Sequence, residues 1–261
     1  MPTASGTEIV TAVSAFVASF LSGLLGIGGG VVLTPLLLYL PPALGIGALP
    51  VKMITGLTIV QAISGSVLGA FRHRAYGNVS ARLVFIMGPT GAAASLVGAL
   101  ISRDVDDRIL LAIFALLALA TAVMLLLPAE PQRRGTDDLH LNVPLAVGIS
   151  IVLGFLGGMV GIGAIATILG TLVYLLRVPP RIAIGTSLGI GMFAAVAALI
   201  GKAATAQIDP PLAAVVALTA LVASPIGAWL SVRTDPRVLL KILAAVVIVA
   251  AIRMAASAVF G

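Results

Sequence analysis

FLSGLLGIGGG, the stretch from Phe20 to Gly30, decides how this chain can fold. Its second half holds four glycines in five residues, and glycine is a poor helix interior because it loses the most backbone freedom on folding. The stretch lies inside an apolar segment from about residue 9 to residue 40. About 32 helical residues would reach roughly 48 Å, whereas the hydrocarbon core of a bilayer is roughly 30 Å thick. We therefore expect this segment to be tilted, broken or folded back at its glycines.

A weaker copy of the stretch occurs in the second half of the chain. Residues 155–163 (FLGGMVGIG) match residues 20–28 at an offset of 135, and SPIGAWLS at 224–231 matches SLVGALIS at 95–102 at an offset of 129. These matches predict a duplicated unit. The prediction is a first membrane repeat at 1–128, a polar linker at 129–141 and a second membrane repeat at 142–261.

Composition indicates an all-α polytopic membrane protein. Apolar residues make up 60% of the chain and charged residues 9%, against about 25% charged in an average soluble domain. The N-terminal residues carry no Lys or Arg, so we expect the first apolar run to be a retained membrane element. The predicted location is a bacterial inner membrane, crossed several times. The predicted apolar segments are 9–40, 50–71, 80–101, 108–128, 142–176, 182–201, 210–231 and 237–260.

Several other classes of protein are disfavoured. The net charge is +6, but the Lys and Arg residues are scattered singly or in pairs, which is typical of topological anchors and not of a nucleic-acid surface. Cysteine is absent. Residues 185–189 (GTSLG) satisfy the G-x-S-x-G pattern of a nucleophile elbow, yet the surroundings are an apolar helix and no His follows. We expect no enzyme, no cofactor and no metal site.

The glycine run followed by Thr34-Pro35-Leu36 resembles the TauE/SafE-type sulfite exporter family. Residues 184–188 (IGTSL) and 76–79 (YGNV) support the resemblance, which extends over essentially the whole chain. It implies movement of sulfite, a sulfonate or a related organosulfur anion. The chain departs from the pattern where Ala164-Ile165 stand opposite Gly29-Gly30, and where Thr55-Gly56 stand opposite Thr186-Ser187. The two half-sites should therefore differ in how closely backbone approaches a ligand.

Glycine-interrupted segments at matching positions of two halves are typical of a transporter binding site. A helix that begins near mid-membrane offers unpaired N–H groups and partial positive charge to an oxyanion. The alternative is close helix packing at small-xxx-small pairs, which we favour for Gly65/Gly69, Gly154/Gly158 and Gly185/Gly189. For the site we predict backbone at Gly28, Gly29, Gly30, Gly161 and Gly163, with hydroxyl donors at Thr34, Thr167, Thr186 and Ser187.

Ionisable side chains near segment ends are expected to snorkel to the interface, namely Lys52, Lys202 and Lys241. Arg253 lies deeper in its segment and is a candidate substrate ligand, with snorkelling as the alternative. Gln61, near the middle of the second segment, is expected to form a hydrogen bond between helices. No Asp or Glu falls clearly inside a predicted span, so a carboxylate proton relay has no obvious carrier.

Two topologies fit the segments. If all eight cross once, the halves are parallel and the cations divide 8 to 7, which decides nothing. If the first segment of each half folds back, the halves are inverted and the division is 10 to 5, which favours this arrangement with both termini outside. The five on the outer side would be Lys52, Arg103, Arg108, Lys202 and Arg253.

The sequence thus predicts a membrane transporter that exports a small sulfur-containing anion by alternating access. Its partners would be that anion and the lipid bilayer, with no nucleic acid. An anion channel has the same composition and would differ by lacking saturable, counter-gradient flux. A membrane scaffold or assembly factor also has it, but would not need glycine breaks at matching positions. Substrate identity, coupling ion and oligomeric state stay open.

Overall fold

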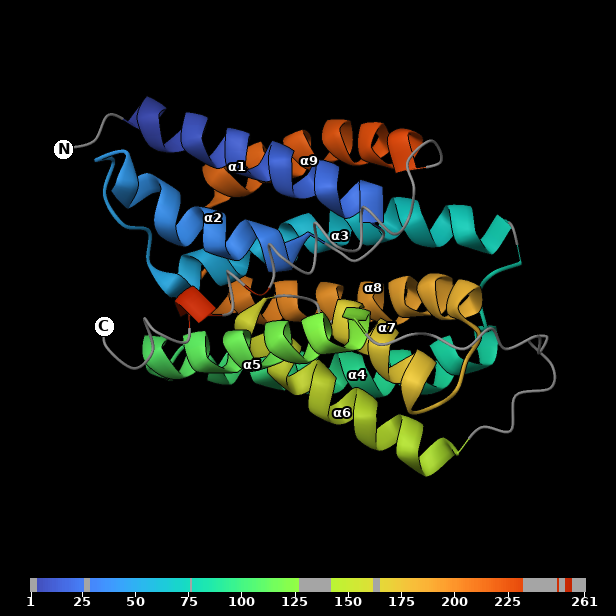
Figure 1. Cartoon of the computed structure of the whole chain (residues 1–261). Coiled ribbons are helices and arrows are strands. Elements are labelled where there is room, and N and C mark those ends of the chain that lie inside the picture. Colours follow the sequence, from blue (N-terminus) through green and yellow to red (C-terminus); the bar gives the residue numbers. More distant parts are fainter. Residues whose placement is uncertain are drawn as a thin grey trace.

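The computed structural model in Figure 1 is built from long helices that lie side by side. The structure describes residues 4–25, 29–75, 77–126, 142–161, 165–231, 248 and 252–254. Within these ranges all regular structure is helical. The helices are α1 Ala4–Leu25, α2 Gly30–Ala43, α3 Val51–Ala75, α4 Ala81–Ile101, α5 Asp107–Leu126, α6 Val143–Val160, α7 Ile165–Tyr174, α8 Pro180–Ala204 and α9 Pro210–Ser231.

Six stretches of the described helices are long and apolar enough to cross a bilayer. They lie in α1, α4, α5, α6, α8 and α9, while α2, α7 and the first part of α3 are shorter apolar stretches. Seven of the predicted segments correspond to described helices. The eighth, 237–260, and the linker 129–141 lie outside the described residues, apart from Ile248 and Ile252–Met254.

Each of the two long glycine-containing segments forms two helices instead of one. In the first, α1 ends at Leu25 and α2 begins at Gly30, where the Gly29 carbonyl accepts from the N–H groups of Val32 and Leu33 at 3.0 and 2.9 Å. In the second, α6 ends at Val160 and is capped by Gly161, whose φ of +78° is a left-handed conformation that suits glycine. The Gly161 N–H closes the last turn on the Gly157 carbonyl at 2.9 Å.

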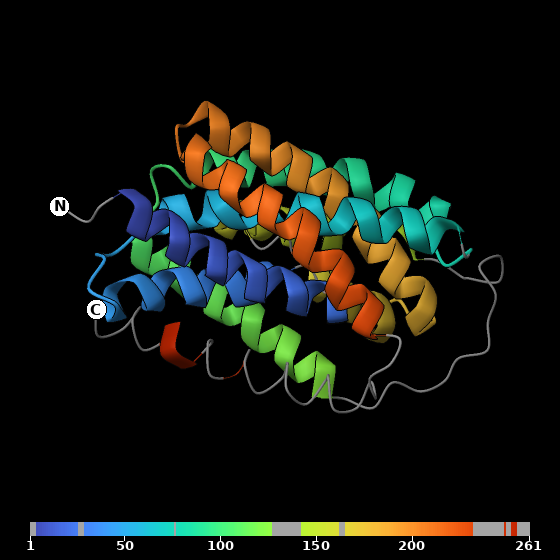
Figure 2. The same ribbon diagram turned by 90° about the horizontal axis from the view of Figure 1, so that it is seen from above.

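The two helix pairs open toward opposite ends of the molecule (Figures 1 and 2). α2 runs back along α1, so that the start of α1 and the end of α2 both lie at the same end of the molecule. α6 starts at the other end and α7 returns to it. The sequence-matched segments therefore enter the helix assembly from opposite directions.

Glycines allow two helix pairs to pack at backbone distance. Between α1 and α9, a Cβ added at Gly23 would collide with the Ser224 carbonyl, and one at Gly227 with the Phe20 carbonyl. Between α4 and α6 the corresponding collisions involve other residues: Gly158 with the Ser95 carbonyl and Gly98 with the Phe155 carbonyl. Gly23 and Gly158, like Phe20 and Phe155, are 135 positions apart, and the partners on α4 and α9 are 129 apart. The two interfaces therefore follow the same two offsets as the sequence matches.

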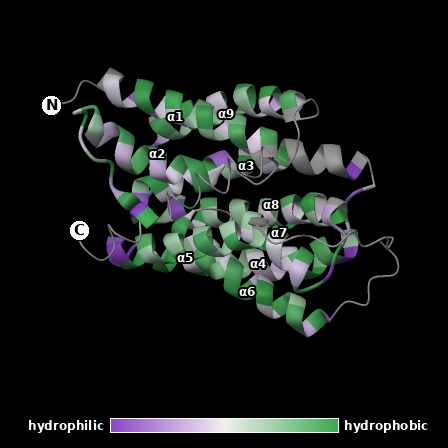
Figure 3. Cartoon of the chain, in the orientation of Figure 1, coloured by the Kyte–Doolittle hydropathy of each residue, from purple (hydrophilic) through white to green (hydrophobic). Residues whose placement is uncertain are grey.

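The glycine pairs assigned to packing agree with this picture where the structure describes them. A Cβ at Gly154 would meet the Gly91 carbonyl on α4, and one at Gly189 would meet the Val84 side chain. The outer flanks of the helices are apolar and the hydrophilic residues gather mainly toward the helix ends (Figure 3). Large apolar side chains such as Phe85 and Leu218 are 72% and 66% exposed, which is typical of a protein whose solvent is lipid.

Candidate functional site

Both glycine breaks lie against one face of α3. A Cβ at Gly161 would collide with the Thr55 carbonyl oxygen and the Thr58 hydroxyl, and a Cβ at Gly29 would collide with the Gln61 side chain. Thr55, Thr58 and Gln61 are three residues apart in turn, so they share a helix face. The polar face of α3 therefore brings the break of the first half and the break of the second half together within about two helical turns.

Gln61 of α3 connects the first break to both α3 and α1 through hydrogen bonds. Its amide contacts the Ser19 hydroxyl of α1 at 3.0 Å. In the amide orientation that satisfies both atoms, Oε1 accepts from the Ser19 hydroxyl and N–H, and Nε2 donates to the Gly29 carbonyl at 3.2 Å. The predicted hydrogen bond between helices is confirmed. Gln61 is 1% exposed, so this bond fixes the break inside the protein.

The predicted hydroxyl donors are buried, and each already has a protein partner. Thr34 donates to the Gly30 carbonyl at 2.9 Å and Ser187 donates to the Ile184 carbonyl at 2.9 Å, both within their own helices. Among the described residues, no hydrogen bond joins any two of the four predicted hydroxyls. The other two reach neighbouring segments: Thr167 shares a hydrogen bond with Thr121 of α5 at 2.9 Å, and Thr186 accepts from the Ser80 N–H at 3.0 Å.

Of the remaining predicted site residues, the structure describes Gly30 and Arg253 but not Gly28 and Gly163. Gly30 is buried as the first residue of α2, next to Gly29, whereas Gly28 and Gly163 lie outside the described residues. Arg253 is exposed, with its guanidinium carbon 5.8 Å from the centre of the Tyr39 ring on α2. Tyr39 lies nine residues beyond Gly30, so Arg253 sits over the far part of α2.

The expectation that Lys202 snorkels to the interface is wrong. Its side chain is 0% exposed, because Nζ turns inward from the last turn of α8. Four acceptors from four other segments lie within hydrogen-bond distance of Nζ and share its three N–H donors: Thr55 Oγ1 of α3 at 2.9 Å, Ser102 Oγ after α4 at 2.7 Å, the Met159 carbonyl of α6 at 3.0 Å and Gln207 Oε1 after α8 at 2.7 Å. We call Lys202 with these acceptors the Lys202 cluster. Lys52, by contrast, is half-buried and donates to the Arg103 carbonyl.

The Lys202 cluster is continuous with the second break. Thr55 is both an acceptor for Lys202 and the residue whose carbonyl lies against Gly161. Met159 lies two residues before Gly161, at the carbonyl end of α6 where peptide groups lack helical partners and carry partial negative charge. A lysine ammonium at this end of α6 is therefore electrostatically favourable.

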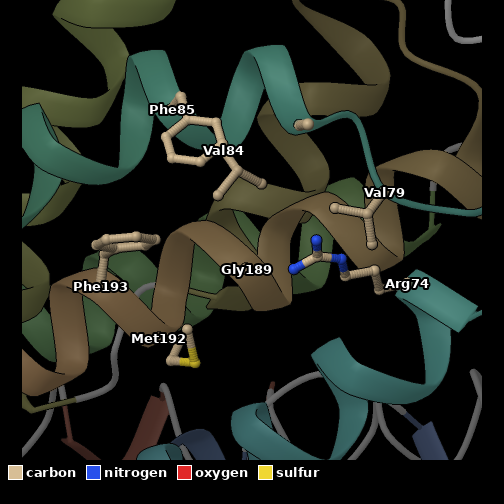
Figure 4. Close-up of a pocket in the computed structure, with 8 residues that line it drawn as sticks. Arg74, Val79, Val84, Phe85, Gly189, Met192 and Phe193 are labelled. Atoms are coloured by element: carbon tan, nitrogen blue, oxygen red, sulfur yellow. The ribbon is translucent and has the colours of Figure 1, made fainter.

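A separate pocket of about 290 Å³ lies between the end of α3, the start of α4 and α8 (Figure 4). Its walls are mostly apolar, and the exposed Arg74 extends its guanidinium toward the α8 backbone near Gly189. None of the predicted site residues lines it. Among the described residues, no group of His, Cys, Asp or Glu side chains could hold a metal ion.

A scan against protein-family models matches residues 11–254 to the model described as "Sulfite exporter TauE/SafE". The chain belongs to this family. The match includes both glycine breaks and the Lys202 cluster. The TauE/SafE family is one of transporters and not of enzymes, so this protein is a multi-pass membrane transporter.

Curated relatives carry the same general description. The "Probable membrane transporter protein YjnA" of Bacillus subtilis is 26% identical over 246 residues, 90% of this chain and 94% of the relative. A "Probable membrane transporter protein" of Xylella fastidiosa strain Temecula1 is 30% identical over 194 residues, 73% and 72% of the two chains. The "Probable membrane transporter protein MJ0441" of Methanocaldococcus jannaschii is 23% identical and covers 85% of each chain. No solved structure matches this TauE/SafE protein significantly.

Proposed function

We propose that this protein exports a small sulfur-containing anion, sulfite or an organosulfonate, across a bacterial inner membrane. The observation that carries the proposal is the meeting of two helix breaks, at Gly29 and at Gly161, on one polar face of α3. In lipid, broken helices are tolerated only where the freed backbone groups are buried in protein or face a cavity. A pair of such breaks at matching positions is the arrangement that transporters use for ligands near mid-membrane.

In the proposed mechanism, the segments 1–128 and 142–261 form inverted repeats joined by a linker at 129–141. The two re-entrant pairs, α1–α2 and α6–α7, open toward opposite ends of the molecule, which supports this relation. The glycine contacts that recur at offsets of 135 and 129 support it as well. Alternating access follows if the two repeats exchange conformations, so that the site at the breaks faces one side and then the other.

Backbone N–H groups at the start of α2 and α7 would hold the anion oxygens, because helix starts carry unpaired donors and partial positive charge. The buried hydroxyls of Thr34, Thr167 and Ser187 would contribute donors only after leaving their present partners, whereas Thr186 accepts its hydrogen bond from the Ser80 N–H and could donate while keeping it. Arg253 would act at the surface of α2, where the anion arrives or departs, and not at the breaks.

Counterflow in proteoliposomes tests this function. Vesicles that contain the purified full-length protein are preloaded with unlabelled sulfite, a sulfonate, sulfate or thiosulfate, and uptake of labelled sulfite is followed. Transient, saturable accumulation with sulfite or sulfonate inside supports the proposal. Non-saturable flux without counterflow would indicate a channel, and no flux of any of the four anions would contradict an anion transporter.

Glycine substitution tests the site. Gly29→Val places a branched side chain against Gln61 and the Ala18 carbonyl, and should abolish counterflow. Gly30→Val extends the blockage to the first residue of α2. Both variants are compared with wild type by size-exclusion profile, so that a folded protein without transport is distinguished from an unfolded one. Normal counterflow by folded variants would remove the breaks from the mechanism.

A further inference from the structure

Lys202 is a fully buried cation whose hydrogen-bond partners, among the residues that the structure describes, are all neutral. Its four acceptors are two hydroxyls, one amide oxygen and one backbone carbonyl. No carboxylate among the described residues bonds to it. The charges that act on it from farther away are Lys52 and Asp107, which have opposite signs. The cluster itself therefore leaves one positive charge without a compensating negative charge.

A charge of this kind is expensive inside a membrane. Placing a lysine at the centre of a membrane helix costs about 2.5–3.5 kcal/mol by insertion measurements, and the usual escape is to snorkel. Lys202 does not snorkel to the interface, although it lies close to the end of α8. A neutral side-chain donor could bond to the Met159 carbonyl without adding charge. The need for a hydrogen-bond donor at the last carbonyls of α6 therefore does not explain why the donor is a lysine.

The surrounding groups match an oxyanion once the cluster opens. The Thr55 and Ser102 hydroxyls now donate to the carbonyls of Lys52 and Ala99 at 2.8 and 2.7 Å. The Gln207 Nε2 donates to Thr205 Oγ1 at 2.7 Å. Each of these donors can turn about a single side-chain bond. Together with the ammonium they would present donors from several directions, as the three oxygens of sulfite or of a sulfonate group require.

We propose that Lys202 binds the transported anion directly, with the anion oxygens replacing its neutral acceptors when α6 and α7 move relative to α3. This inference rests on the proposed function and names the charged ligand of that same site. Thr55 and Ser102 come from the first half of the chain, and Met159, Lys202 and Gln207 from the second. An anion that engages the cluster would therefore bridge the halves whose relative movement gives alternating access.

The chain carries this charge once. Thr55 and Thr186 occupy matching positions in α3 and α8, 131 residues apart, and at the same offset Lys202 corresponds to Phe71. The matching position in the first half thus lacks a cation. One monovalent anion would neutralise the single Lys202 charge, so we expect one anion per chain and rejection of neutral analogues.

Binding and transport of Lys202 variants test the inference. Lys202→Gln keeps a donor for the Met159 carbonyl and removes the charge, whereas Lys202→Arg keeps the charge with a different shape. Loss of one charge-assisted hydrogen bond should weaken binding of labelled sulfite and of ethanesulfonate by about tenfold to hundredfold in Lys202→Gln. Lys202→Arg should bind more tightly than Lys202→Gln. Lys52→Met is the comparison, because it removes a half-buried charge that acts on the cluster only from a distance, and it should weaken binding by much less than Lys202→Gln does.

Thermal melting with and without 10 mM sulfite separates binding from structure. The inference predicts that sulfite raises the melting temperature of wild type and Lys52→Met but not of Lys202→Gln. If Lys202→Gln does not fold, Lys202→Met in nanodiscs is measured in its place. If neither variant folds and sulfite does not raise the melting temperature of Lys202→Arg, the role of Lys202 is structural and the inference fails. Wild-type binding affinity in Lys202→Gln also overturns it. Absence of sulfite and sulfonate binding in wild type would instead contradict the proposed function.

Discussion

At the residue scale, Gln61 is the polar side chain that holds the first helix break in place. It is buried and bonds to Ser19, and its amide also reaches the Gly29 carbonyl. Gln61→Leu removes these bonds and should lower the free energy of unfolding by about 0.6–1.7 kcal/mol, the range for hydrogen bonds between membrane helices. Unfolding in a titration with SDS measures the change.

Ser64→Ala is the matched control for Gln61→Leu. Ser64 lies on the same helix, and among the described residues its hydroxyl bonds to the Val60 carbonyl one turn before it and to no other helix. Its removal should change the free energy of unfolding by less than Gln61→Leu does. Equal effects of the two substitutions would mean that the amide of Gln61 does not fix the break.

Gly161 is the residue whose backbone conformation ends α6. Its φ is +78°, and a Cβ would also collide with the Thr55 carbonyl oxygen, a backbone atom that cannot rotate away. The left-handed conformation alone costs a non-glycine residue about 1–2 kcal/mol. Gly161→Ala should therefore lower both the melting temperature and the counterflow rate.

Gly148 provides the comparison on the same helix. A Cβ at Gly148 meets no atom within 4 Å, so Gly148→Ala should keep or raise stability by up to about 1 kcal/mol, the difference between glycine and alanine in a helix. The melting temperatures of Gly161→Ala and Gly148→Ala measure the difference. If Gly161→Ala melts at or above the temperature of Gly148→Ala, the break at Gly161 does not depend on glycine.

The sequence predicted where the two long segments break, but it did not predict the burial of Lys202. Glycine runs can be recognised in the sequence alone, and in the structure Gly29 and Gly161 both pack against the same face of α3. Lys202 lies at the end of an apolar run, and in one dimension that position is typical of an interfacial anchor. Its burial depends on Thr55 and Ser102, which are 147 and 100 residues away in the chain. No local pattern carries that information.

At the element scale, helix contact in lipid depends on close backbone packing, because lipid gives apolar helices little reason to associate. Gly23 on α1 and Gly158 on α6 each face a serine carbonyl, of Ser224 and Ser95 respectively. Because these environments correspond, Gly23→Val and Gly158→Val should destabilise the protein by similar amounts, on the order of 1–3 kcal/mol for overpacking. Melting temperatures measured by size exclusion after heating provide the comparison.

Gly148→Val controls for the helix propensity of valine, since a Cβ there has free space. It should melt close to wild type. If Gly23→Val lowers the melting temperature strongly and Gly158→Val does not, the interfaces α1–α9 and α4–α6 are not equivalent. The inverted-repeat proposal would then lose this support.

The elements themselves follow from the sequence where a physical signal is local. Length and hydropathy predicted the helical segments, and glycine entropy predicted that residues 9–40 would not form one straight span. For the direction of α2 and α7 after each break, the sequence offered no local signal, and only the division of Lys and Arg favoured folding back. That direction depends on which helices lie alongside, and α2 packs against both α1 and α3 while α7 packs against α5 and α8.

At the scale of the whole molecule, the two re-entrant pairs lead to a test of topology. The end of α2 and the end of α7 lie at opposite ends of the helix assembly (Figure 1). Leu44 follows α2 and is 57% exposed, and Leu175 follows α7 and is 50% exposed. Because the chain contains no cysteine, Leu44→Cys and Leu175→Cys each introduce a unique thiol.

A membrane-impermeant maleimide added to intact cells should label Leu44→Cys and should label Leu175→Cys only after the membrane is opened. This result follows if the termini and the α2 end lie outside, as the 10 to 5 division of Lys and Arg favours. Parallel repeats would place the two thiols on the same side, so equal labelling in intact cells would contradict the inverted arrangement. The reverse pattern would keep the inverted repeats but reverse the orientation of the whole protein, which would place the last turn of α8 toward the cytoplasmic side. The cysteine-free parent sets the background, and labelling of both variants after permeabilisation establishes that each thiol is reactive.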